Sequence, residues 1–231
     1  MNSITSAFRA ASLISAVEQM ARAEGISLEV RTDIENYGPV REDQPGRGPV
    51  TVMFDPAYAD VDAHNSFWIQ GSDSKGKIVH TQAARYFDID SESMAQQFYE
   101  NMALNFMRLE GTDKTCSDAD CPMMHERIQG LVCYHGEIWL DSKYRGKGLS
   151  KYLPRLLMAL AFVKWSPSYI FGLIPEKLAN CGIGTQYGYF HIEPNGFVLN
   201  IPEMPIIRKW LVWMAAEDMH RLVGQLPEAE S

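Results

Sequence analysis

The chain has 231 residues, of which 46% are hydrophobic and 22% are charged, and this composition excludes global disorder. Its formal net charge of -8 argues against binding to nucleic acid or to anionic membranes, unless basic residues cluster locally. The length fits one domain or one domain with an appendage, and no apolar run reaches the about eighteen residues of a membrane-spanning helix.

The N-terminal segment predicts an amphipathic helix over residues 4–22, because its apolar residues recur at helical spacing and Gly25 ends the pattern. Charges at Arg9, Glu18 and Arg22 interrupt the apolar stretch that a secretory signal peptide requires. The sequence therefore predicts a cytoplasmic location.

Short strands and a hairpin are predicted next. Alternation over 26–31 indicates a strand, the glycines and prolines of 36–49 indicate a loop, and the β-branched run 50–54 indicates another strand. Residues 67–71 and 77–89 flank a turn and predict a long antiparallel hairpin.

The middle of the chain alternates helices and strands. Residues 90–107 show an apolar helical face, and 111–127 form a polar loop. A strand is predicted over 131–141, with a bulge at Gly136, and a helix with apolar residues at steps of three and four is predicted over 149–164.

The C-terminal third predicts a buried strand over 168–174, a second hairpin over 187–201 and a Trp-rich amphipathic helix over 205–222. We therefore expect a mixed α/β fold, in which a central twisted sheet is flanked by helices and contains one parallel strand–helix–strand crossover. Residues 1–200 would form the domain, and 201–231 a helical extension packed on it.

A cysteine run in the polar loop has two interpretations. Cys116, Cys121 and His125 form a C-x4-C-x3-H pattern, to which Cys133 and His135 could add ligands for zinc. Structural zinc sites favour tighter paired spacing, so free thiols and no metal are the preferred prediction.

The segment YRGKGLS at 144–150 carries the clearest chemical signal. Gly146 and Gly148 permit a tight turn that exposes backbone amides, and the helix that follows presents its first amides and its positive dipole end. Five cations and no acid occur within thirteen residues of an acidic chain: Lys143, Arg145, Lys147, Lys151 and Arg155. The segment therefore predicts a site for a polyanion.

Two common phosphate motifs do not fit this segment. The G-x-G-x-x-G of dinucleotide folds lacks its third glycine, and G-x-x-x-x-G-K-[ST] is absent. The pattern R-x-x-G-x-S at Arg145, Gly148 and Ser150 closely resembles the Q/R-x-x-G-x-G/A signature of the GNAT acetyltransferase superfamily. The element order from residue 1 to about residue 200 resembles that family too.

This resemblance implies a GNAT-like fold and an N-acetyltransferase that uses acetyl-CoA, or another acyl-CoA, and an amine acceptor. In the family, the preceding strand pairs with the pantetheine arm and the turn holds the pyrophosphate. The positions along the pantetheine would be Ile138, Trp139 and Leu140. Those around the pyrophosphate would be Arg145, Gly146, Lys147, Gly148, Leu149 and Ser150.

The sequence departs from the family pattern at two places. Ser150 stands where glycine or alanine is usual, and its hydroxyl can donate to a phosphate. If Gly188 and Tyr189 take the place of the family's G-F pair, then the position of its usual tyrosine falls on Gly184.

Acyl transfer needs a group to take the proton of the ammonium and a group to protonate the thiolate. Glu137, on the strand expected to face the acyl group, is the first candidate for the base, and His135 is the second. Tyr187 is the candidate acid, while Tyr189 or His191 could serve in a shifted register.

The acceptor and the oligomeric state are less defined by the sequence. Acidic residues at Asp113, Asp118 and Asp120 could attract a cationic amine or simply form a solvated loop. Trp210 and Trp213 could complete a core or a homodimer face, or line a longer acyl chain.

Two alternatives to an acyl-CoA-dependent enzyme remain open. A GNAT-like module could bind coenzyme A without catalysis, which the missing tyrosine favours. An acyltransferase could also take its acyl group from an acyl carrier protein that docks on Lys143, Lys147 and Lys151.

Overall fold

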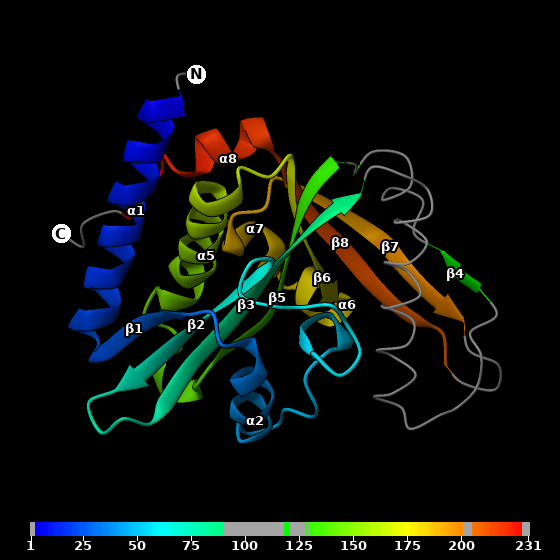
Figure 1. Cartoon of the computed structure of the whole chain (residues 1–231), viewed down its shortest axis with the longest axis horizontal. Helices are drawn as coiled ribbons and strands as arrows, with labels where there is room; N and C mark the ends of the chain where they lie inside the picture. The colour runs from blue at the N-terminus through cyan, green and yellow to red at the C-terminus, as the bar shows by residue number, and fades with distance from the viewer. Residues whose placement is uncertain (1–2, 90–117, 121–127, 129, 201–204, 228–231) are drawn as a thin grey trace.

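The computed structural model describes residues 3–89, 118–120, 128, 130–200 and 205–227. Within these residues one sheet of eight strands has the spatial order β1-β2-β3-β5-β6-β8-β7-β4 (Figure 1). The strands are β1 (Ile26–Arg31), β2 (Ser66–Asp73), β3 (Ile78–Ile89), β4 (Asp118–Asp120), β5 (Gly130–Leu140), β6 (Tyr169–Pro175), β7 (His191–Asn200) and β8 (Ile207–Ala215).

The sheet is mixed. The pair β5–β6 is parallel, and every other neighbouring pair is antiparallel. The helices are α1 (Ser3–Ala23), α2 (Tyr37–Glu42), α5 (Leu149–Trp165), α6 (Glu176–Asn180), α7 (Ile183–Tyr187) and α8 (Ala216–Leu222). Short 3-10 turns are η1 (Ile34–Asn36), η2 (Val52–Phe54) and η3 (Ser142–Tyr144).

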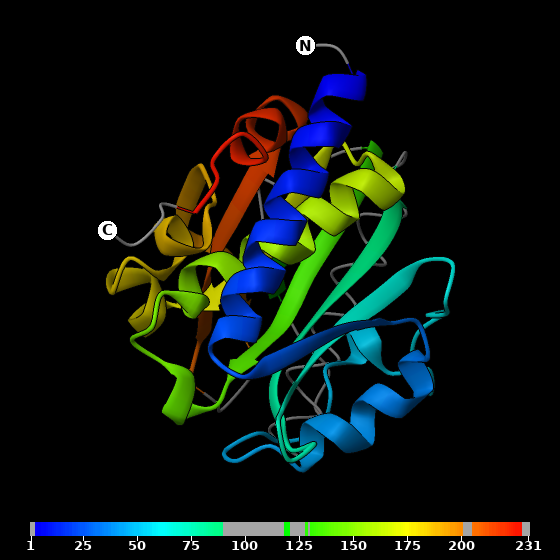
Figure 2. The same cartoon turned by 90° about the vertical axis from the view of Figure 1, so that its left-hand side faces the viewer.

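Both faces of the sheet are covered. Phe67 and Ile69 of β2 belong to the core beneath α1 and α5, and these two helices lie one in front of the other on that face (Figure 2). Trp68, between them, points to the opposite face and packs against Tyr37, with ring centroids 5.1 Å apart. This alternation follows from the two-residue period of a strand, and it divides the core into two layers.

Most elements predicted for the described residues are confirmed. The elements that form as predicted are the N-terminal helix α1, the strand β1, the hairpin of β2 and β3, the strand β5, the helix α5 and the buried strand β6. The predicted bulge near Gly136 is present as a register shift between β3 and β5. The helix over 90–107 and most of the loop over 111–127 lie outside the described residues, whereas 118–120 form β4 and not a loop.

The loop predicted over 36–49 is wrong at its start, because Tyr37–Glu42 form α2. Pro39 lies in the first turn of this helix, where a missing N–H costs no hydrogen bond. The strand predicted over 50–54 is also wrong: Val52–Phe54 form η2, and all three side chains are buried. A half-buried strand would instead bury alternate side chains.

The hairpin predicted over 187–201 is wrong. Residues 183–187 form α7, and β7 runs through His191–Asn200 as one strand that pairs with β8 on both sides of a bulge between Glu193 and Phe197. The Pro-Asn-Gly sequence therefore forms a bulge, with Asn195 at a φ of 56°, and the chain does not reverse there.

The terminal helix predicted over 205–222 is wrong for its first half. Residues 207–215 form β8, which lies between β6 and β7, and only Ala216–Leu222 are helical. Leu211 and Val212 of β8 are fully buried in different core layers, so the strand lacks the polar alternation that would reveal it. The sheet thus crosses the boundary predicted at residue 200.

The described helices include none that is long and apolar enough to span a bilayer.

Candidate functional site

The strands β5 and β6 separate in the middle of the sheet. They pair in parallel only where Val132–Tyr134 face Tyr169–Phe171, yet both strands continue beyond that point. On the other edge of β5, Glu137 and Ile138 together oppose the single residue Gln82 of β3. Glu137 has a φ of 59°, a left-handed conformation that a bulge accommodates. We call this divergence of the two strands the fork.

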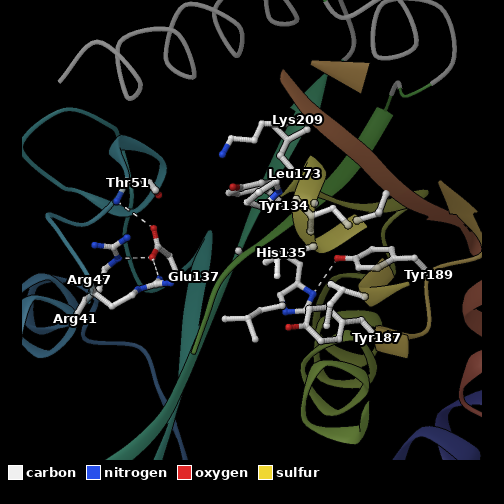
Figure 3. A pocket seen from close by; sticks show the side chains of 18 residues that line it. Arg41, Arg47, Thr51, Tyr134, His135, Glu137, Leu173, Tyr187, Tyr189 and Lys209 are labelled. Atoms are coloured by element: carbon white, nitrogen blue, oxygen red, sulfur yellow. Dashed lines mark hydrogen bonds and ion pairs between the residues drawn. The ribbon is translucent and has the colours of Figure 1, made fainter. Parts of the chain in front are cut away.

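Two adjoining cavities lie at the fork. The first, of about 270 Å³, is lined by residues 134–138 of β5, 172–175 of β6 and Lys209 of β8, and is drawn in Figure 3. The second, of about 370 Å³, extends along residues 138–140 to the turn before α5. Arg47, Ile138, Leu178, Ile183 and Tyr187 line both cavities. The fork is therefore connected to the glycine turn.

The turn before α5 has the backbone that the sequence predicts. Gly146 and Gly148 adopt left-handed φ values of 79° and 75°, and Gly148 precedes the first residue of α5. Leu149 and Ser150 open this helix, where backbone amides have no acceptor inside the helix. Arg145 donates from Nε to the carbonyl of Leu140 at 3.0 Å, which ties the turn to the end of β5. A helix N-terminus with free amides and the positive end of its dipole favours an anion, so the turn has the geometry expected of an anion-binding site.

Five of the nine residues predicted to hold the coenzyme line the second cavity. They are Ile138, Trp139, Leu140, Arg145 and Ser150. Of the others, Leu149 is buried in the core, and Lys147 places Nζ 2.6 Å from Oε2 of Glu24, the residue after α1. Ser150 accepts a hydrogen bond from the side-chain amide of Gln186 in α7 at 3.2 Å.

Glu137 lies at the first cavity in an enclosed ion-pair cluster. Its Oε2 accepts from Nε of Arg41 and from a terminal nitrogen of Arg47, and its Oε1 accepts from the backbone amide of Thr51 at 3.1 Å (Figure 3). The Glu137 side chain is 2% exposed. The carboxylate therefore fastens the α2–η2 segment to the bulge of β5.

The sequence does not predict the part that the two arginines take in this cluster. Arg41 and Arg47 are 96 and 90 residues from Glu137, so no local spacing relates them to β5. A charge pattern in the sequence cannot show this pairing, because it exists only once α2 docks beneath the sheet.

His135 and Tyr189 belong to a buried hydrogen-bond chain. The side-chain amide of Gln82 donates to the carbonyl of Leu153 at 2.6 Å, which leaves Oε1 of Gln82 to accept from Nε2 of His135 at 3.1 Å. Nδ1 of His135 then accepts from the hydroxyl of Tyr189 at 3.0 Å. Burial lowers the pKa of His135 to about 3, so the imidazole is neutral at physiological pH.

Gly172 of β6 allows this contact. A side chain there would lie 2.9 Å from the carbonyl oxygen of His135 and 3.1 Å from the Tyr189 hydroxyl. Only glycine leaves that space to the tyrosine.

Tyr187 ends α7 and lines both cavities. Burial raises the pKa of its phenol, and the nearby Arg145 opposes this by favouring the phenolate. Among the described residues the Tyr187 hydroxyl has no hydrogen-bond partner, so its proton is available to a ligand. His191, the other candidate, instead pairs with Asp218 at 3.0 Å and stacks on Trp213 with ring centroids 3.9 Å apart.

The residues considered for the acceptor and for a metal lie elsewhere. Asp118 and Asp120 are on β4 at the edge of the sheet, and Asp113 is outside the described residues. Cys116, Cys121 and His125 are also outside them. The residues that the structure describes contain no group of three or more His, Cys, Asp or Glu side chains placed to hold a metal ion.

No family model and no curated protein sequence matches the chain. Several solved acetyltransferase structures do match it in fold. NAA60 of Arabidopsis thaliana, solved with acetyl-CoA, is 8% identical over 82% of this chain and 99% of its own, with a TM-score of 0.48.

Two further matches are to other acetyltransferases. The aminoglycoside acetyltransferase AAC(6')-Ib, solved with coenzyme A and kanamycin, is 14% identical over 85% of this chain and 98% of its own, with a TM-score of 0.43. A protein from Vibrio cholerae, described as a candidate ribosomal-protein-serine acetyltransferase, is 10% identical over 65% of this chain and 64% of its own, with a TM-score of 0.36.

The fold is mixed α/β, and the elements around the turn follow the order that the sequence predicts. Antiparallel strands β1, β2, β3 and β5 are followed by the glycine turn, the crossover helix α5 and the parallel strand β6.

Proposed function

We propose that the chain is an acyl-CoA-dependent N-acyltransferase that transfers an acetyl or other small acyl group to a primary amine. The observation that carries this proposal is the pair of adjoining cavities, which leads from the anion-binding turn to the fork. A long ligand with an anionic end and a reactive end would fit this shape.

In this proposal the coenzyme lies along the second cavity. The pyrophosphate would bind the amides that open α5, with Arg145 and the hydroxyl of Ser150 beside it. The pantetheine arm would follow Ile138–Leu140, whose edge toward β6 is free because the two strands pair only up to residue 134 on β5. The thioester would then reach the fork near Glu137.

The reaction forms a C–N bond and breaks a C–S bond. The neutral amine attacks the thioester carbonyl, and a backbone amide at the bulge stabilises the developing oxyanion. The C–S bond then breaks as the thiolate takes a proton from Tyr187, the nitrogen gives its extra proton to water, and Tyr187 regains a proton from water. Tyr187 is preferred to Tyr189 as the acid, because the Tyr189 proton is already donated to His135.

Glu137 has a narrower role in this proposal than that of a free base. A carboxylate has about four lone-pair sites, and Arg41, Arg47 and Thr51 occupy three of them. The remaining site on Oε1 can accept one hydrogen bond from the amine or from a water that carries its proton away. Glu137 would therefore orient the acceptor.

The test is release of free thiol from acetyl-CoA, propionyl-CoA and octanoyl-CoA with a panel of amines, beside calorimetric binding of the same donors. Amine-dependent thiol release supports the proposal. Binding with no turnover on any amine would identify a coenzyme-binding module, and turnover only with an acylated carrier protein would identify a different donor. No binding of any acyl-CoA would overturn the proposal.

A further inference from the structure

His80 lies on β3 with its imidazole ring in the wall of the second cavity, and the residue is fully buried. Two residues further along the strand, Gln82 projects from the same face of the sheet and bonds to Leu153 of α5. Gly71 on the neighbouring strand β2 leaves room for the ring, because a side chain there would lie 2.9 Å from Cβ of His80. The fold therefore holds this imidazole between the sheet and α5, at the cavity.

The hydrogen bonding of the His80 ring is only half complete. Its Nδ1 lies 2.7 Å from the carbonyl oxygen of Trp139, and a carbonyl can only accept, so Nδ1 carries the hydrogen. Burial lowers the pKa of His80 to about 4, so the ring is neutral at physiological pH and its Nε2 is a bare acceptor. This Nε2 is buried and has no hydrogen-bond partner among the described residues. A buried acceptor without a donor costs free energy, which a ligand with a suitable donor would restore.

The described residues around His80 do not supply that donor. Gln82, on the same face of β3, already donates to the carbonyl of Leu153 and accepts from Nε2 of His135. Pro154 of α5 lines the same cavity, but a proline has no backbone N–H to give. The donor would therefore come from a molecule in the cavity.

The register of the sheet sets His80 beside the proposed path of the coenzyme. His80 lies opposite Leu140 of β5, and its bond to Trp139 reaches the same stretch of that strand. In the proposed function the pantetheine arm follows this stretch. The arm carries two amide N–H groups and one hydroxyl group, so it offers the kind of donor that Nε2 of His80 lacks.

We propose that Nε2 of His80 accepts a hydrogen bond from an N–H or O–H group of the pantetheine arm. The role of His80 is to hold the arm against β5, whereas the turn before α5 holds the charged end of the same molecule. This inference rests on the proposed function, because it adds a binding residue to the same coenzyme site. It makes recognition depend on the arm as well as on the phosphates.

Two substitutions separate the two nitrogens of the ring. His80→Asn places an amide N–H near the position of Nδ1, so it can keep the bond to Trp139, but it leaves no acceptor at the position of Nε2. His80→Gln places an amide oxygen near the position of Nε2 and loses the bond to Trp139. In calorimetric titration with acetyl-CoA, we expect His80→Asn to weaken binding about fivefold to tenfold, the range of a neutral hydrogen bond. His80→Gln is expected to weaken it by about twofold or less.

A second ligand shows whether the effect belongs to the arm. The nucleotide 3'-phospho-ADP has the phosphates of coenzyme A and lacks pantetheine, so both variants are expected to bind it as the wild-type protein does. A loss of acetyl-CoA affinity as large for His80→Gln as for His80→Asn would overturn the proposal, because His80 would then act only through Trp139. A loss that appears equally with 3'-phospho-ADP would overturn it too.

The wild-type protein gives a test that does not depend on the folding of the variants. Nitrogen NMR of histidine-labelled protein reports Nε2 of a neutral ring directly, and a hydrogen bond to this nitrogen moves its resonance upfield. We expect acetyl-CoA to move the His80 Nε2 resonance in this way and 3'-phospho-ADP to leave it in place. A resonance that acetyl-CoA does not move would contradict the assignment.

The same measurements separate this inference from the acyltransferase function. If the arm-dependent effects at His80 are seen but no amine is acylated, then the binding role of His80 stands and the proposed reaction fails. If amines are acylated while His80→Asn binds acetyl-CoA as the wild-type protein does, then the reaction stands and the role of His80 is wrong. If no acyl-CoA binds, then both proposals fail.

Discussion

The hydroxyl groups of Tyr187 and Tyr189 lie in the same cavity lining but have different partners. Tyr189 donates to His135, whereas Tyr187 has no partner among the described residues. We expect Tyr187→Phe to lower kcat roughly 10²-fold with little change in acetyl-CoA affinity, the range of general acid catalysis. Steady-state kinetics beside calorimetric binding checks this.

The control for Tyr187 is Tyr189→Phe, which removes a structural hydrogen bond. It is expected to lower the free energy of unfolding by about 1 kcal/mol and kcat by much less than the first variant. If Tyr189→Phe had the larger effect on kcat, our assignment of the acid would be wrong.

Gly148 combines a left-handed backbone with a position at the mouth of α5. At φ 75° a β-branched residue is strained, so Gly148→Val is expected to shift the amides of the turn and to weaken acetyl-CoA binding at least tenfold. Calorimetry measures the affinity. Gly76→Val is the control, because Gly76 has a φ of 79° in the β2–β3 turn, away from both cavities. Normal binding by a folded Gly148→Val protein would contradict our placement of the pyrophosphate.

Among single residues, the sequence predicts the conformation of the glycine turn better than the surroundings of Glu137. Arg145, Gly148 and Ser150 are close in the chain, so their spacing alone shows the turn. Glu137 is different, because its role depends on Arg41 and Arg47, which reach it only through tertiary packing. Local patterns carry no information on such long-range pairs.

The segment that contains α2 and η2 is fastened to β5 through the Glu137 cluster. We expect Arg41→Met to lower the free energy of unfolding by about 3 kcal/mol, because it leaves the buried Glu137 carboxylate with one guanidinium fewer. Denaturant unfolding measures the change. The double variant Arg41→Met, Glu137→Met should recover part of the loss, and an additive loss would contradict the coupling.

Helices and strands were predictable from the sequence where one of their faces is polar or where a sharp turn adjoins them. The hairpin of β2 and β3 is marked by its sharp turn between Asp73 and Lys77, whereas residues 211–214 of β8 are buried on both faces. Pro194 and its neighbours show how a turn signal can mislead, since they form a bulge when the same partner strand continues past them. The centre of the sheet was therefore the part hardest to predict.

For the whole molecule, two buried histidines make stability depend on pH. Burial lowers the pKa of His80 to about 4 and that of His135 to about 3, from an ordinary value of 6.5. As the pH falls below about 6.5, the unfolded chain takes up these protons before the folded chain does. The stabilisation that comes from burying the two neutral histidines is thus complete above pH 6.5. It is lost as the pH falls toward 4, and at pH 5 the free energy of unfolding is lower by about 2 kcal/mol for each histidine.

Urea unfolding at pH 7.5, 6.5, 5.5 and 5.0 measures this loss, which is large against the roughly 5–15 kcal/mol stability of an ordinary domain. His80→Gln is expected to remove about half of the pH dependence, because the remaining half belongs to His135. His64, which is exposed in the loop before β2, supplies the control: His64→Gln should leave the curve unchanged. Because carboxylates such as Asp33 titrate below this range, a flat wild-type curve between pH 6.5 and 5 would show that the histidines are not buried as described.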